Sequence, residues 1–188
     1  MPTVNRAKKT TMEKSYKEYL QHITTFVFDV DGVLTDGTIK VNTEGEMFRT
    51  MNIKDGYALK TAVEQGFNVC IISGGTNEGV RVRLRNLGIT DIHLGAHHKT
   101  ETLNEYLATN NLKRENVLYM GDDLPDYAVM HEIGLPTCPQ DAVPEIKAIS
   151  KYVSHKKGGK GCVRDVIEQV LKVQGKWIFT SGASAKYD

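Results

Sequence analysis

Two aspartates follow the first strongly apolar run of the chain, in the stretch FVFDVDGVLTDG, where Asp29 and Asp31 lie one residue apart. A buried carboxylate is costly unless it is paired or binds a metal ion. A second acidic group, Asp122, Asp123 and Asp126, follows another apolar run, in VLYMGDDLPD. Carboxylate oxygens with no imidazole or thiolate among them suit Mg²⁺. The two acidic groups therefore predict a magnesium site.

Two further polar groups suit a phosphate. Ser73 and Gly74 follow the apolar run NVCII, where a hydroxyl and backbone N–H groups can bind phosphate oxygens, and Lys99 offers a positive charge. An aspartate is a competent nucleophile towards phosphorus. A second carboxylate two residues later can act as general acid and then as general base. The residue types together predict a phosphoryl-transfer site.

These groups need a scaffold that brings strand ends together. Apolar runs predict buried strands at 24–29, 67–73 and 116–122, with shorter strands at 134–139 and 151–155. Apolar residues at helical spacing predict helices at 57–65, 77–86, 100–109 and 162–173. This alternation predicts an α/β fold with a Rossmann-like, mostly parallel sheet and helices on both faces. Ligands collect at the carboxyl ends of such strands, where the polar groups lie.

One segment interrupts the alternation. Residues 36–54 contain apolar residues that alternate with polar ones, and a turn at NTEG, so they predict a β-hairpin flap over the carboxyl end of the sheet. We expect one phosphoryl-transfer domain over 24–177, preceded by a tail with a short helix at 1–23. The composition of 178–188 predicts a C-terminal tail.

Composition narrows the class of protein. The formal net charge of +1 gives no reason to expect a nucleic acid or a membrane as partner, and no apolar run is long enough for a signal peptide or a membrane span. The three cysteines, Cys70, Cys138 and Cys162, are scattered and form no CxxC motif. Free thiols in a reducing compartment are the expected state, so we expect a cytoplasmic protein.

The motifs DVDGVLTDG, IISG, Lys99 and GDDLPD, in this order, resemble the four motifs of the haloacid dehalogenase superfamily of phosphohydrolases. The resemblance covers about 24–177. The short hairpin in place of a cap domain, with IKDGYALK, GGKGCVRDV and VQGKW, resembles the 3-deoxy-D-manno-octulosonate 8-phosphate phosphatases of lipopolysaccharide sugar biosynthesis. This resemblance implies a sugar-acid phosphate substrate, Mg²⁺ dependence and a homotetramer in which hairpins of adjacent subunits help close each site.

The resemblance also implies residue roles. Asp29 would be the nucleophile and a metal ligand, and Asp31 the general acid/base, which also binds the metal through its carbonyl oxygen. Ser73 and Lys99 would hold the phosphate, and Asp122 would be the remaining protein ligand. Asp123 and Asp126 would support the metal site and Lys99.

One departure from the family pattern bears on the substrate. Many relatives carry an arginine where this chain has Gly75, so Lys54, Arg81 or Arg85 would have to contact the sugar acid, or the substrate differs. Phosphatases of sialic-acid-type 9-phosphates share the architecture and stay an alternative, as does another small sugar phosphate. For His97 and His98 we expect loop positions without a ligand role.

Two interpretations that assign the protein to other functional classes involve the same residues. A phosphoaspartate receiver-like signalling domain also has acidic residues, a hydroxyl and a lysine on an α/β sheet, but it does not need an acid/base such as Asp31. A structural tetramer subunit without activity would not need the intact set.

Overall fold

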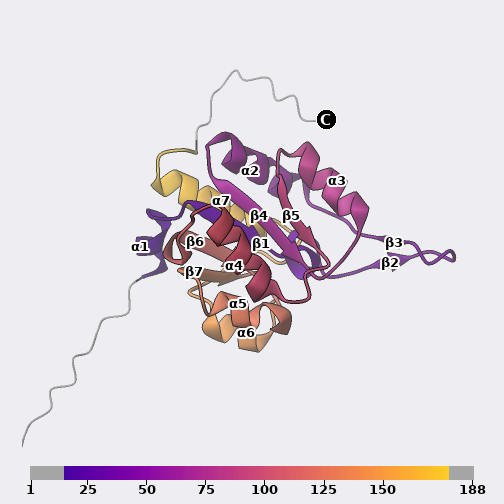
Figure 1. Ribbon diagram of the computed structural model, residues 1–188. Coiled ribbons are helices and arrows are strands. Elements are labelled where there is room, and N and C mark those ends of the chain that lie inside the picture. The colour runs from indigo at the N-terminus through magenta and orange to yellow at the C-terminus, as the bar shows by residue number, and fades with distance from the viewer. Residues whose placement is uncertain (1–14, 178–188) are drawn as a thin grey trace, which may run out of the picture.

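The computed structural model describes residues 15–177, and a sheet of six parallel strands runs through its centre in the order β5-β4-β1-β6-β7-β8 (Figure 1). The strands are β1 (Thr25–Phe28), β4 (Asn68–Ser73), β5 (Asp91–Leu94), β6 (Val117–Met120), β7 (Leu135–Cys138) and β8 (Tyr152–Val153). The predicted α/β fold with a parallel sheet is confirmed. Of the predicted tail and short helix at 1–23, residues 1–14 lie outside the described residues, as does the predicted C-terminal tail at 178–188.

Helices cover both faces of the sheet because successive strand residues point to opposite faces. Phe26 and Phe28 pack into one apolar cluster, with α1 (Tyr16–Leu20), α2 (Ile53–Glu64), α3 (Glu78–Asn86) and α7 (Cys162–Val173). Val27 packs into the other, with α4 (Lys99–Thr109), α5 (Tyr127–Met130) and α6 (Pro144–Ile149). Figure 1 shows the two layers on either side of the strands. Both faces of β1 are therefore buried, as its continuous apolar run predicts.

The chain order creates a crevice beside β1. From β1 the chain builds β4 and then β5 on one side, and it returns to add β6 on the other side of β1. Such a reversal of strand order is where α/β sheets bind ligands, outside the carboxyl ends of the strands. Asp29 follows β1 and Asp122 follows β6, so the topology brings the two acidic groups together.

The hairpin of β2 (Lys40–Val41) and β3 (Met47–Phe48) projects from the body of the protein (Figure 1). Its turn is held by the side chain of Asn42, which accepts hydrogen bonds from the backbone N–H groups of Glu44 and Glu46. The strands are shorter than the pattern predicts. Four apolar side chains of the hairpin are exposed, and they are Ile39, Val41, Met47 and Phe48. Met51 packs against the core instead.

The helix after the hairpin begins four residues earlier than the apolar spacing predicts, at Ile53 rather than Tyr57. The cause is the side chain of Asn52, which accepts a hydrogen bond from the N–H of Lys54 at 2.8 Å and so caps the first turn. Lys54 therefore belongs to α2 and not to the flap. Asp55, in the same turn, caps the start of α7 by accepting from the N–H groups of Gly161 and Arg164.

A late segment supports the loop that follows β1. Val33 lies in that loop, and its carbonyl accepts from the N–H of Gly159 at 2.9 Å and from the thiol of Cys162 at 3.2 Å. A Cβ atom at Gly158 would collide with the carbonyl of Gly32. The close approach of the two backbones thus needs glycine at 158.

Candidate active site

A cavity of about 450 Å³ opens at the carboxyl ends of β1, β4 and β6. We call it the carboxylate cavity, and its lining residues are Asp29, Asp31, Gly37, Ser73, Gly74, Gly75, Ala96, His97, Lys99, Asp122, Asp123, Pro125 and Asp126. The fold thus brings together every site residue predicted from the sequence except the candidate sugar-acid contacts Lys54, Arg81 and Arg85.

Lys99 bridges two buried carboxylates, one directly after β1 and one in the segment that follows β6. Its Nζ lies 3.0 Å from Oδ2 of Asp29 and 2.7 Å from Oδ1 of Asp126. Burial acts to lower the pKa of Lys99, but the two carboxylates outweigh burial and raise it. Lys99 is therefore a fixed positive charge at the cavity wall.

Tyr119 is a site residue that the sequence did not reveal. Its hydroxyl donates to Oδ1 of Asp126 at 2.7 Å, and the residue is fully buried in β6. Oδ2 of Asp126 accepts from the N–H of Asp122 at 3.2 Å. The Asp126 carboxylate is thus engaged by donors on both oxygens. A tyrosine inside a fully buried strand was the available signal, because its hydroxyl needs a partner.

The carboxylates satisfy the chemistry of a divalent-cation site. One oxygen each from Asp29, Asp122 and Asp126 lies within 4.8 Å of the other two. Asp126 accepts from three donors, the Lys99 ammonium, the Tyr119 hydroxyl and the Asp122 N–H, whereas Asp29 accepts from two, Lys99 and the N–H of Val30. Asp29 and Asp122 are therefore the better ligands, with Asp126 as their support. A side chain at Gly32, where φ is +88°, would collide with the Asp122 carboxylate. That carboxylate therefore packs directly against the backbone of the loop that follows Asp29.

Charge crowding changes the acidity of two of these groups. Burial, followed by the charge of Asp126, raises the pKa of Asp29 to about 6 although Lys99 opposes the shift. Burial, followed by the charges of Asp29 and Asp126, raises the pKa of Asp122 to about 8. One lysine does not neutralise the cluster, and a bound cation would relieve the remaining repulsion.

The remaining predicted groups line the other wall. Ser73 is buried at the end of β4, and its Oγ accepts from the N–H of Gly75 at 3.2 Å, so its own proton is available for an incoming oxygen. Gly74 lines the cavity beside it. Asp31 accepts two bonds from the guanidinium of Arg49. His97 lines the cavity, whereas His98 only precedes the first residue of α4.

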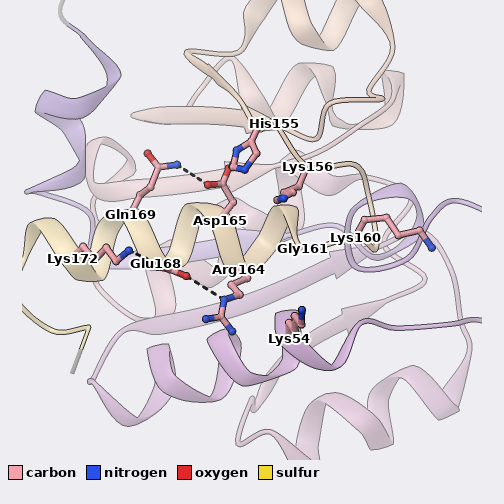
Figure 2. Close-up of a pocket in the computed structure, with 10 residues that line it drawn as sticks. All are labelled: Lys54, His155, Lys156, Lys160, Gly161, Arg164, Asp165, Glu168, Gln169 and Lys172. Atoms are coloured by element: carbon pink, nitrogen blue, oxygen red, sulfur yellow. Dashed lines mark hydrogen bonds and ion pairs between the residues drawn. The ribbon is translucent and has the colours of Figure 1, made fainter. Parts of the chain in front are cut away.

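Lys54 lines a second cavity, of about 550 Å³, beside the start of α7 (Figure 2). Most of the cations there are basic residues of α7 or of the loop before it, and several are already paired. Glu168 accepts from Arg164 at 3.1 Å and lies 2.6 Å from Nζ of Lys172. The contact of Lys54 with a sugar acid stays a prediction. Arg81 donates to the carbonyl of Ile92, and neither Arg81 nor Arg85 lines the carboxylate cavity.

Comparison with known proteins gives consistent results. Residues 85–167 match the model of the haloacid dehalogenase-like hydrolase family. The chain is 37% identical to the 3-deoxy-D-manno-octulosonate 8-phosphate phosphatase of Salmonella typhi over 164 aligned residues. The aligned residues cover 87% of this chain and 87% of that protein.

Solved structures of similar proteins share the fold. The phosphatase of the same name from Yersinia pestis has a TM-score of 0.84 and 35% identity, over 87% of this chain and 88% of that one. The one from Moraxella catarrhalis, solved with magnesium, phosphate and the sugar acid, has a TM-score of 0.83 and 33% identity. The match covers 86% of this chain and 93% of that one.

Proposed function

This chain belongs to the 3-deoxy-D-manno-octulosonate 8-phosphate phosphatases, within the haloacid dehalogenase-like hydrolases, and we propose that it hydrolyses that phosphate monoester with Mg²⁺ as cofactor. The observation that carries the proposal is the carboxylate cavity itself. It combines a nucleophile, a second carboxylate, a hydroxyl, a buried lysine and a carboxylate pair suited to a cation. The alternative phosphatase substrates differ in the sugar and not in the reaction.

In the first half of the reaction Asp29 attacks phosphorus and forms an aspartyl-phosphate. Lys99 lies 3.0 Å from Oδ2 of Asp29, so it holds this carboxylate in place and offsets the negative charge that gathers around it. The Ser73 hydroxyl and the N–H of Gly74 bind the phosphoryl oxygens. Asp29 and Asp122 would hold Mg²⁺, which neutralises charge on the phosphoryl group when bound.

Asp31 transfers the protons. It gives a proton to the alcohol oxygen as the P–O bond breaks, and it then takes a proton from the water that attacks the aspartyl-phosphate. The second step returns free Asp29, inorganic phosphate and a protonated Asp31. The side chain of Asp31 is 35% exposed, so solvent and substrate can reach it.

A turnover screen tests this proposal. The octulosonate 8-phosphate, a sialic-acid-type 9-phosphate and common sugar phosphates are compared at equal concentration with Mg²⁺, and the matched control is Asp29→Asn. We expect the octulosonate ester to have the highest kcat/KM and the control to be inactive. A higher kcat/KM for a nine-carbon ester would assign the alternative substrate, and stable phosphorylation without turnover would indicate a receiver-like domain.

We further propose a homotetramer assembled through the hairpin. The hairpin that carries the four exposed apolar side chains projects from the body (Figure 1), and a two-stranded flap cannot bury them alone. Light scattering of the parent and of Phe48→Ser tests this. Val82→Ser is the matched control, since Val82 is 51% exposed on α3 and Phe48 is 52% exposed. A parent that is monomeric would contradict the proposal.

We also propose that the protein is cytoplasmic. All three cysteines are free and buried, as is usual in a reducing compartment. Among residues 15–177, no helix has the length and apolarity that crossing a membrane requires.

A further inference from the structure

The hairpin contacts the active site of its own subunit through one arginine. Arg49 follows β3, and its Nε lies 2.7 Å from Oδ1 of Asp31 while its Nη2 lies 3.0 Å from Oδ2. One planar guanidinium thus binds both oxygens of one carboxylate, an arrangement that fixes orientation as well as distance. The side chain of Arg49 is only 7% exposed, so the guanidinium is shielded from water, while the side chain of Asp31 stays 35% exposed towards the cavity.

Asp31 accounts for the position of this guanidinium. The third nitrogen, Nη1, is buried and makes no hydrogen bond among the described residues. A buried donor without a partner is unfavourable, so the bonds to Asp31 must compensate for it.

Gly75 provides the space for this contact. A Cβ atom at position 75 would lie 3.3 Å from Nη2 of Arg49 and 3.3 Å from Oδ2 of Asp31, which is tighter than an ordinary contact. Beside it, Nδ2 of Asn77 donates to the carbonyl of Met47 at 3.0 Å and ties β3 to the body. Glycine at 75 and the tie at 77 together let the hairpin bring Arg49 to Asp31.

Building on the proposed phosphatase function, we propose that Arg49 is a positioning residue for the acid/base Asp31. In the acid form one carboxyl oxygen carries the proton for the leaving alcohol, and the other still accepts from Arg49. When the alcohol has left, the carboxylate regains both bonds and faces the water that attacks the aspartyl-phosphate. The hairpin therefore takes part in catalysis in its own subunit, whether or not it also covers a neighbour.

The dependence of kcat/KM on the leaving group separates a positioning role of Arg49 from a structural or a substrate-binding role. Phenyl phosphate and 4-nitrophenyl phosphate have similar shapes and no carboxylate, but phenoxide is the more basic leaving group and gains more from a positioned acid. The value of kcat/KM reports the step that breaks this bond. Arg49→Met, Arg49→Lys and Gly75→Ala are compared with the parent at saturating Mg²⁺, and Lys40→Met, on the exposed part of the hairpin, is the matched control.

We expect Arg49→Met to lower kcat/KM for phenyl phosphate roughly tenfold more than for 4-nitrophenyl phosphate, within the range of general acid catalysis. The sugar-acid phosphate, an alkyl ester, should lose at least as much as phenyl phosphate. Arg49→Lys should recover part of the loss, Gly75→Ala should show the same selectivity more weakly, and Lys40→Met should match the parent. Circular dichroism checks that each variant is folded.

Other patterns overturn the inference. Equal losses on the two aryl esters would mean that Arg49 is structural, and a loss confined to the sugar-acid phosphate would mean that it binds the substrate carboxylate. Unchanged kinetics would mean that the contact with Asp31 has no catalytic role. A parent that hydrolyses none of the esters would instead refute the proposed phosphatase function.

Discussion

Mg²⁺ binding to the carboxylate cavity should release protons and weaken steeply as the pH falls from 8 to 6. Without the metal ion, the pKa of Asp122 is raised to about 8 and that of Asp29 to about 6, in each case first by burial and then by neighbouring carboxylates. A metal ion binds the charged carboxylates, so it must displace any proton that they carry.

The two pKa values set the size of the effect. At pH 8 Asp122 is about half protonated, and at pH 6 it is almost fully protonated while Asp29 is about half protonated. The dissociation constant of Mg²⁺ should therefore rise roughly 100-fold between pH 8 and pH 6, a change of about 2.7 kcal/mol. At pH 7 about one proton should leave for each ion bound, mostly from Asp122.

Isothermal titration calorimetry at pH 7, in two buffers with different ionisation enthalpies, counts the released protons directly. Titrations at pH 6 and pH 8 give the two dissociation constants. In Asp122→Asn the number of protons released at pH 7 should fall to near zero, although the affinity also drops. A dissociation constant that is equal at pH 6 and pH 8 would refute the crowding of charges described above.

The same pKa values predict how pH acts on the metal-free protein. An aspartate in the unfolded chain has a pKa near 3.8, so between about pH 4 and pH 8 the folded protein binds more protons than the unfolded one. The free energy of unfolding should therefore decrease as the pH rises through 6 and 8. Saturating Mg²⁺ should remove most of that decrease, as thermal melts with and without chelator would show.

Three other outcomes are expected. Asp29→Asn and Asp31→Asn should each lower kcat by on the order of 10³-fold or more with an unchanged circular dichroism spectrum, and turnover within tenfold of the parent would rule out their assigned roles. Lys99→Met should lower the free energy of unfolding of the metal-free protein by roughly 3–5 kcal/mol, because Asp29 and Asp126 lose their buried cation. Denaturant titration measures this free energy, and a loss below about 1 kcal/mol would contradict the prediction. Ca²⁺ should bind without supporting turnover, since it accepts longer and more numerous ligands, and equal rates with Ca²⁺ and Mg²⁺ in a metal add-back assay would contradict the proposed site.

Elements marked by an apolar run or by a helical period could be predicted from the sequence, and elements without such a signal could not. The continuous apolar runs of β1, β4 and β6 and the helical spacing of α7 are strong signals, and these elements lie where we predicted them. The strand β5 was missed because its four residues, DIHL, are mostly half-buried and do not form an apolar run. The helices α5 and α6 have four and six residues, which is too short to show a period.

Much of the candidate site could also be predicted, because parallel strands end at one edge of the sheet and so bring their following residues together. The contacts that orient these residues could not. Arg49 and Asp31 are 18 positions apart, and their contact depends on the path of the hairpin and on the space at Gly75. Lys54 was assigned to the flap because the capping role of Asn52 was missed, and the fold places it in a different cavity.

The hydrogen bonds from Gly159 and Cys162 to the Val33 carbonyl have a consequence for when the protein becomes active during its synthesis. Cys162 lies 129 positions after Val33 in the chain, so a ribosome exposes the nucleophile long before it makes the segment that holds the nucleophile's loop in place. Domains generally fold as units. Here α7 also receives its N-terminal cap from Asp55 of α2. Nascent chains should therefore carry every catalytic residue and still be inactive. Hydrolysis should begin only when residues 158–162 have left the ribosome and docked.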